Sequence, residues 1–79
     1  MTIAELKNIL LSWQVPEDLY SIMLGGLPNE KLCLVKESEK HWEVYYSERG
    51  RKSGLKVFES EDKACDYFLR KLSRYRQDS

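Results

Sequence analysis

The chain has 79 residues, a length that accommodates one small domain (residues 1–79) with a thin hydrophobic core. Its 13 basic and 13 acidic residues cancel, which argues against a general nucleic-acid binder and against an acidic mimic of DNA. No apolar run approaches the roughly 20 residues that span a bilayer, and no signal peptide is visible. We therefore expect a cytoplasmic protein without membrane contacts.

The N-terminal segment has the pattern of an amphipathic helix from about residue 3 to 13. Thr2 and Glu5 have the spacing of a capping box, and apolar residues then recur at steps of three and four. The helix should end before Pro16, because the residue before a proline avoids the helical region. Residues 16–22 can form a short turn. Residues 25–29 (GGLPN) are a strong breaker, which we interpret as a plain turn and not as a phosphate loop, because no strand precedes them.

Three strands should follow, at residues 31–36, 41–47 and 55–58. The first is apolar on both faces, and the second places Trp42, Val44 and Tyr46 on one face. Short links make neighbouring strands antiparallel. If Leu55 and Val57 lie on the same side as Trp42, the opposite side carries the following residues: Cys33, Val35, Tyr45, Lys56 and Phe58.

The C-terminal segment predicts a second amphipathic helix. Ser60 is its cap, acidic residues occupy its first turn, and a stripe of Cys65, Phe68, Leu69 and Leu72 forms its apolar face. The element order is α-β-β-β-α. We therefore predict an α+β fold, in which two helices pack on one face of a three-stranded antiparallel sheet.

The reactive side chains favour a protein that is not an enzyme. His41 is the single histidine and has no companion set, so we interpret it as a surface residue and predict no metal site, cofactor or catalytic residue. Cys33 and Cys65 lie in apolar runs without a repeating spacing, which indicates free thiols in a reducing compartment. Cys65 should be buried, and burial raises the pKa of a thiol and makes it inert.

The outer side of the predicted sheet is the best candidate for a binding surface. It is rich in apolar and aromatic side chains, which is unusual for the uncovered face of a monomer. Tyr45 would be an aromatic anchor, Arg49 a charge-assisted hydrogen-bond donor and Lys56 a flanking charge. We predict the following partner-binding residues: Glu43, Tyr45, Ser47, Glu48, Arg49, Arg51, Lys52 and Lys56.

Two alternatives remain open at the level of sequence. A bulge of one residue would exchange the two faces and place Tyr45 in the core. The basic hairpin could also be a solvated turn, with Arg49 paired to Glu48 or Glu43.

Several segments together resemble a group of small bacterial immunity proteins. They are residues 16–20, residues 25–30, residues 42–50 (WEVYYSERG), Lys52, Leu55, Phe58, residues 64–65 and residues 67–69. The resemblance covers the chain from about residue 3 to 72. It implies a non-catalytic protein, encoded beside a polymorphic or contact-dependent toxin, that binds the cognate toxin domain, often a nuclease, and blocks it.

The order α-β-β-β-α also resembles the double-stranded RNA-binding domain, which is the alternative. That resemblance implies a cluster of lysines at the start of the last helix to bind phosphates. This chain has Ser60, Glu61, Asp62 and Lys63 there, and two acidic residues would repel the RNA backbone. We therefore expect a protein partner and disfavour nucleic acid.

Overall fold

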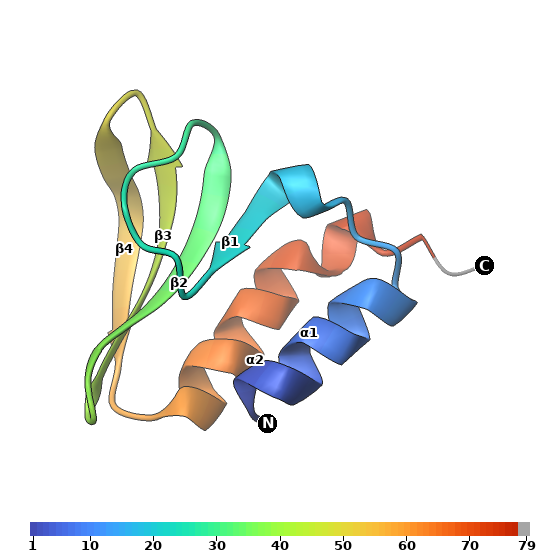
Figure 1. The fold of residues 1–79 in the computed structure, drawn as a ribbon, viewed down its shortest axis with the longest axis horizontal. Coiled ribbons are helices and arrows are strands. Elements are labelled where there is room, and N and C mark those ends of the chain that lie inside the picture. The colour runs from blue at the N-terminus through green and yellow to red at the C-terminus, as the bar shows by residue number, and fades with distance from the viewer. Residues whose placement is uncertain (78–79) are drawn as a thin grey trace.

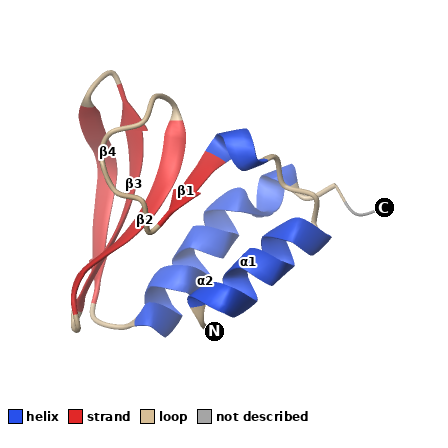
Figure 2. Cartoon of the chain, viewed as in Figure 1, coloured by secondary structure: helices blue, strands red, loops and turns tan. Residues whose placement is uncertain are grey.

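The computed structural model describes residues 1–77 and has the expected α+β class. Its elements, in chain order, are α1 (Ile3–Ser12), a 3₁₀ turn (Glu17–Leu19), β1 (Tyr20–Ile22), β2 (Lys31–Ser38), β3 (His41–Glu48), β4 (Arg51–Phe58), α2 (Glu61–Leu72) and a second 3₁₀ turn (Ser73–Tyr75). Figure 1 shows both helices on one side of a twisted sheet, and Figure 2 shows the same layers by element type. Neither helix has the length and apolar character needed to cross a membrane.

The sheet has four strands in the order β1-β2-β3-β4, so the prediction of a three-stranded antiparallel sheet is wrong. The additional strand is β1, which pairs in parallel with β2 through Tyr20 opposite Leu32 and Ile22 opposite Leu34. The other two pairs of strands are antiparallel, as expected. A strand of three residues is too short to show a periodic pattern, which is why the sequence indicated only a turn there.

A β-bulge in β4 changes which of its side chains face the helices. Val44 pairs with Lys56, but Tyr46 pairs with Ser53. Two residues of β4, Gly54 and Leu55, therefore stand opposite the single β3 residue Tyr45. Gly54 has φ +62°, a conformation that glycine adopts at little cost. The extra residue shifts the alternation of β4 by one position.

As a result, the predicted faces are correct for β3 and wrong for β4. Trp42 and Val44 are buried on the helix side, as expected. Phe58 pairs with Trp42 on that same side, and its ring centroid lies 5.2 Å from that of Tyr67 on α2. Leu55 and Val57 instead point away from the helices and are 45% and 53% exposed.

The ends of α1 are fixed by two capping motifs. At its N-terminus the predicted capping box is present: Thr2 Oγ1 accepts from the Glu5 N–H at 3.2 Å, and Glu5 Oε1 accepts from the Thr2 N–H at 2.8 Å. At its C-terminus the Val15 N–H donates to the Leu10 carbonyl at 3.1 Å, and Gln14 has φ +59°. This is a Schellman motif, which ends the helix and returns the chain toward the core.

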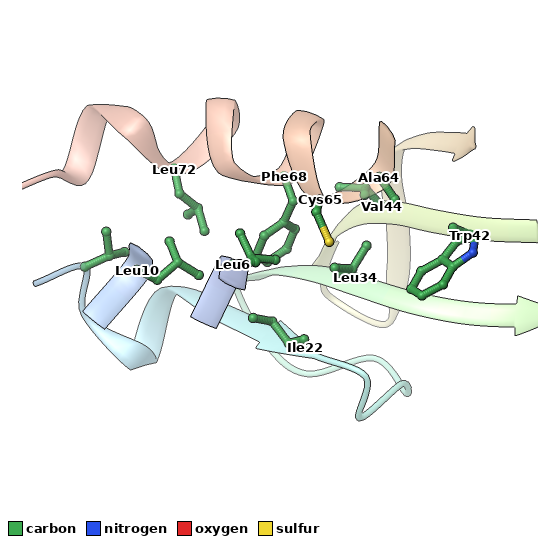
Figure 3. Close-up of a cluster of buried hydrophobic side chains, with 11 residues drawn as sticks. Leu6, Leu10, Ile22, Leu34, Trp42, Val44, Ala64, Cys65, Phe68 and Leu72 are labelled. Atoms are coloured by element: carbon green, nitrogen blue, oxygen red, sulfur yellow. The ribbon is translucent and has the colours of Figure 1, made fainter. Parts of the chain in front are cut away.

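The main core lies between the helices and the sheet (Figure 3). Leu6 and Leu10 of α1 and Phe68 of α2 are fully buried against the strands. Cys65 is also buried there, and both cysteines are free, as predicted. Trp42 is only 5% exposed, so its replacement by Ala should cost about 3–5 kcal/mol of stability.

Candidate functional site

The outer side of the sheet is covered by the loop between β1 and β2. Because these two strands are parallel, the chain must return along the sheet before β2 can begin. Residues 23–30 make this return, and Figure 1 shows the loop (teal) passing over the strands. The segment at residues 25–29, predicted to be a plain turn, therefore covers the sheet, and the strand β1 precedes it. The Tyr45 hydroxyl donates a hydrogen bond of 2.8 Å to the carbonyl of Gly26 in this loop.

Beneath the loop lies a second, smaller core made of Cys33, Val35 and Tyr45. Tyr45 is 1% exposed, so the expectation that it is an exposed aromatic anchor is wrong. The side chain does point away from the helices, as predicted, but the loop removes it from solvent. Tyr45→Ala should therefore cost about 3–5 kcal/mol, as for other buried aromatic side chains, and not the small loss of an exposed residue.

Glu43 lies between His41 and Lys52 beside this small core. Its carboxylate lies 2.9 Å from His41 Nε2 and 3.1 Å from Lys52 Nζ, and its side chain is only 13% exposed. The hydrogen bond with His41, followed by the interactions with Lys52, lowers the pKa of Glu43. Lys52 Nζ also lies 4.6 Å from the centre of the Tyr45 ring. Three of the predicted site residues therefore form one connected group: Glu43, Tyr45 and Lys52.

Ser47 is a fourth predicted site residue, and it is also buried. It is fully inaccessible to solvent, and its hydroxyl has no hydrogen-bond partner among the residues that the structure describes. A buried hydroxyl without a partner costs about 1–3 kcal/mol. In the described conformation Ser47 cannot contact a partner protein.

The tip of the β3–β4 hairpin presents the predicted cations to solvent. Arg49 has φ +49° and Gly50 has φ +73°, the positive values that a two-residue type I′ turn requires. Arg49 and Arg51 are exposed and form no ion pair with any residue in the described part of the chain. The alternative pairing of Arg49 with Glu43 is not found, because Glu43 is engaged by His41 and Lys52. Glu48, the residue before the turn, is partly buried.

Lys56, the remaining predicted residue, lies on the other side of the sheet from Tyr45 because of the bulge. It contributes to a groove of about 520 Å³ between β3–β4 and the C-terminal end of α2. We call this the cationic groove and define it by six of its lining residues: Tyr46, Lys56, Tyr67, Lys71, Arg74 and Tyr75. Glu30 supplies the only carboxylate among the described lining residues.

The residues of the cationic groove other than Lys56 are absent from the predicted site. Tyr67 and Lys71 are one helical turn apart on α2, and Lys71 Nζ lies 5.5 Å from the Tyr67 ring centre. Their spacing could have indicated a shared face. Their position opposite β4 depends on the bulge, which the sequence did not reveal.

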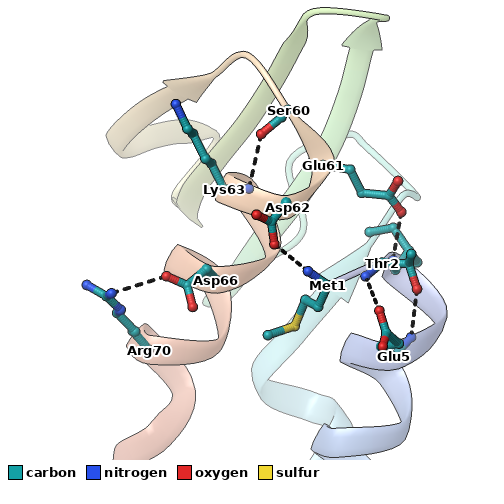
Figure 4. Close-up of polar contacts among 10 residues, drawn as sticks. Met1, Thr2, Glu5, Ser60, Glu61, Asp62, Lys63, Asp66 and Arg70 are labelled. Atoms are coloured by element: carbon teal, nitrogen blue, oxygen red, sulfur yellow. Dashed lines mark hydrogen bonds and ion pairs between the residues drawn. The ribbon is translucent and has the colours of Figure 1, made fainter.

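The acidic start of α2 has a structural role (Figure 4). Asp62 pairs with the terminal ammonium of Met1, which lowers the pKa of its carboxyl group. The Ile3 N–H donates to Glu61 Oε2 at 2.8 Å, while Ser60 caps α2 by accepting from the Lys63 N–H at 3.2 Å. These contacts join the first turns of the two helices.

The two cysteine thiols lie in different cores, Cys65 in the main core and Cys33 in the smaller one. Burial raises the pKa of the Cys65 thiol to about 11 and also raises that of Cys33, so both are protonated at neutral pH. Within residues 1–77 no group of three His, Cys, Asp or Glu side chains could hold a metal ion. Comparison of the chain with protein families, curated proteins and solved structures found no match.

Proposed function

We propose that this chain is a bacterial immunity protein that binds a cognate toxin domain and neutralises it by steric occlusion, without catalysis. The observation that supports a binding role is an apolar surface on the outer side of the sheet. The loop exposes three large apolar side chains, and β4 exposes two more: Met23, Leu24, Leu27, Leu55 and Val57. Single exposed apolar residues are normal, whereas several on one side of a small domain indicate an interaction surface.

The charges beside this surface suit a protein partner. Arg49 and Arg51 stand at the hairpin tip and form no ion pair within residues 1–77, and arginine is enriched among the residues that dominate binding energy. A stable interface buries about 800 Å² on each partner. That is roughly a seventh of the 5276 Å² surface of this domain, so one face is large enough.

The resemblance of residues 42–50 to immunity proteins is what specifies a toxin as the partner. Such a partner, for example a nuclease, would be met in the cytoplasm of the producing cell. Occlusion requires only that the interface cover the active surface of the toxin, so no catalytic group is needed in this chain.

Co-expression with the toxin domain encoded by the gene upstream of this chain tests the proposal. We expect the toxin domain alone to arrest growth, and this chain to relieve the arrest and to co-purify with it in a stable complex. If the upstream product is not toxic, or if no complex forms, the proposal is wrong.

A pair of leucine variants tests the surface itself. Leu24 in the loop is 84% exposed, and Leu11 on α1 is 61% exposed and lies on the helical layer. Leu24→Asp should abolish protection against the toxin, and Leu11→Asp should retain it. Both variants should have a free energy of unfolding within about 0.5 kcal/mol of that of the parent. Full protection by Leu24→Asp would show that the loop is not the interface.

A further inference from the structure

Strand β4 is a long and uncovered edge of the sheet. Among the strands of residues 1–77 it pairs only with β3, and residues 51–57 are all exposed. Figure 1 shows no element beside its outer edge. An edge strand presents a row of N–H and C=O groups without partners, which can accept a further strand. The opposite edge, β1, has only three residues.

The side chains of β4 favour one kind of added strand. The strand carries three cations, Arg51, Lys52 and Lys56, and no acidic residue. A second copy of this chain would bring two such strands together, and like charges on neighbouring strands are destabilising. Lysines and a bulge on an edge also discourage indiscriminate pairing. An acidic strand would instead be attracted.

The cationic groove extends this preference beyond β4. Lys56 faces the groove, and Lys71 and Arg74 line its other wall. None of the three forms an ion pair with a residue of the described chain. Side chains alternate between the two faces of a strand, so every second side chain of an added strand would point toward these cations. The others would lie beside Leu55 and Val57 on the outer side.

We propose that β4 binds an extended acidic segment of a partner protein as a fifth strand. Acidic side chains at alternate positions would enter the cationic groove, and apolar side chains between them would extend the outer apolar surface. Main-chain hydrogen bonds provide affinity in such strand addition, and the alternate side chains provide specificity. This strand site specifies the chemistry of the segment that the partner contributes, and it rests on the proposed function.

A synthetic peptide tests this without the partner. The probe is a blocked octapeptide in which Glu alternates with Val and Thr, and its control has Gln in place of Glu. We expect the Glu peptide to protect β4 amides from hydrogen exchange and the Gln peptide to bind about tenfold more weakly. If the peptide shifts the NMR resonances of groove residues without new protection of the β4 amides, strand addition is overturned. Equal binding of the two peptides would overturn the role of charge.

Charge-reversal variants locate the site. Lys56→Glu and Lys71→Glu should each weaken binding of the Glu peptide about tenfold or more, whereas Lys7→Glu on the exposed surface of α1 should not. An equal effect of all three would mean that only net charge matters and would overturn the inference. Protection of β4 in the free protein, with a dimer mass by light scattering, would identify a second copy as the occupant and would also overturn it. If the peptide binds as expected but the upstream gene product does not, the proposed function fails while the strand site stands.

Discussion

Glu43 is the residue through which the outer side of the sheet responds to pH. Its carboxylate is held between His41 and Lys52, and both contacts favour the ionised form. The pKa of Glu43 is therefore lower in the folded chain than in the unfolded chain. A group of this kind stabilises the fold fully above its unfolded pKa, about 4.3 for Glu, and loses that contribution as the pH falls through the folded value.

We predict that Glu43→Gln lowers stability at pH 7 and that its difference from the parent shrinks below about pH 4. Urea unfolding at pH 7, 4 and 3 measures this difference. Lys52→Gln is the matched control, and it should retain part of the pH dependence because His41 remains a partner of Glu43. A difference between Glu43→Gln and the parent that stays constant with pH would contradict the assignment.

The loop at residues 23–30 is the element that closes the smaller core, and one hydrogen bond holds it to Tyr45. Cys33 lies under this loop, whereas Cys65 lies between the helices and the sheet. A loop opens locally at less cost than the packed core. The two thiols therefore report on two different opening events.

We predict that Cys33 reacts with a thiol reagent faster than Cys65 and that its rate depends less on urea, because loop opening exposes less surface. Tyr45→Phe removes a hydrogen bond worth about 0.5–1.5 kcal/mol, which should speed labelling of Cys33 roughly two- to tenfold. Mass spectrometry of the labelled protein follows both sites. Equal rates and equal urea slopes for the two thiols would show that the loop and the core open together.

The helices could be predicted from sequence, and the full sheet could not. The capping box at Thr2, the cap at Ser60 and the stripe ending at Leu72 are local signals, and all three are present in the structure. The pairing of β1 with β2 is a tertiary contact between segments that carry no mutual signal. The loop that covers Tyr45 results from that pairing, so the burial of Tyr45 could not be predicted either.

Only those parts of the candidate site that depend on neighbouring residues in the sequence could be predicted. The hairpin cations Arg49 and Arg51 are exposed, as their turn sequence indicated. Lys56 changes sides because of the bulge at Gly54, and neither the sequence period nor the composition of β4 fixes where an extra residue is accommodated. The cationic groove needs the position of α2 against β4 and so emerges only from the fold.

Arg49 combines an unfavourable backbone conformation with an exposed charge. Residues other than Gly, Asn and Asp rarely adopt positive φ, and a type I′ turn favours Asn before Gly. We predict that Arg49→Asn raises stability by up to about 1 kcal/mol while weakening binding to the partner. Urea unfolding together with the co-expression assay measures both effects. A destabilised Arg49→Asn would mean that the arginine side chain supports the hairpin.

The two helices form one layer of the molecule, and the charge at the start of α2 bears on whether RNA could bind there. Both helices lie on the same side of the sheet, and the start of α2 is acidic, whereas the resemblance to a double-stranded RNA-binding domain implies lysines at that position. Glu61 and Asp62 are engaged by the backbone and the terminal ammonium of the first residues. They therefore stabilise the contact between the helices, and their negative charge would repel a phosphate at this position.

We predict that the chain does not bind double-stranded RNA at physiological salt. The acidic start of α2 repels the backbone, and a net charge of zero provides no general attraction. A mobility-shift titration with an RNA duplex of about 16 base pairs, the length that such domains contact, measures this directly. The variant Lys71→Glu is the control for the cationic groove. Micromolar binding that falls steeply as salt rises, and that Lys71→Glu leaves intact, would place RNA on the helical layer and would reverse the preference for a protein partner.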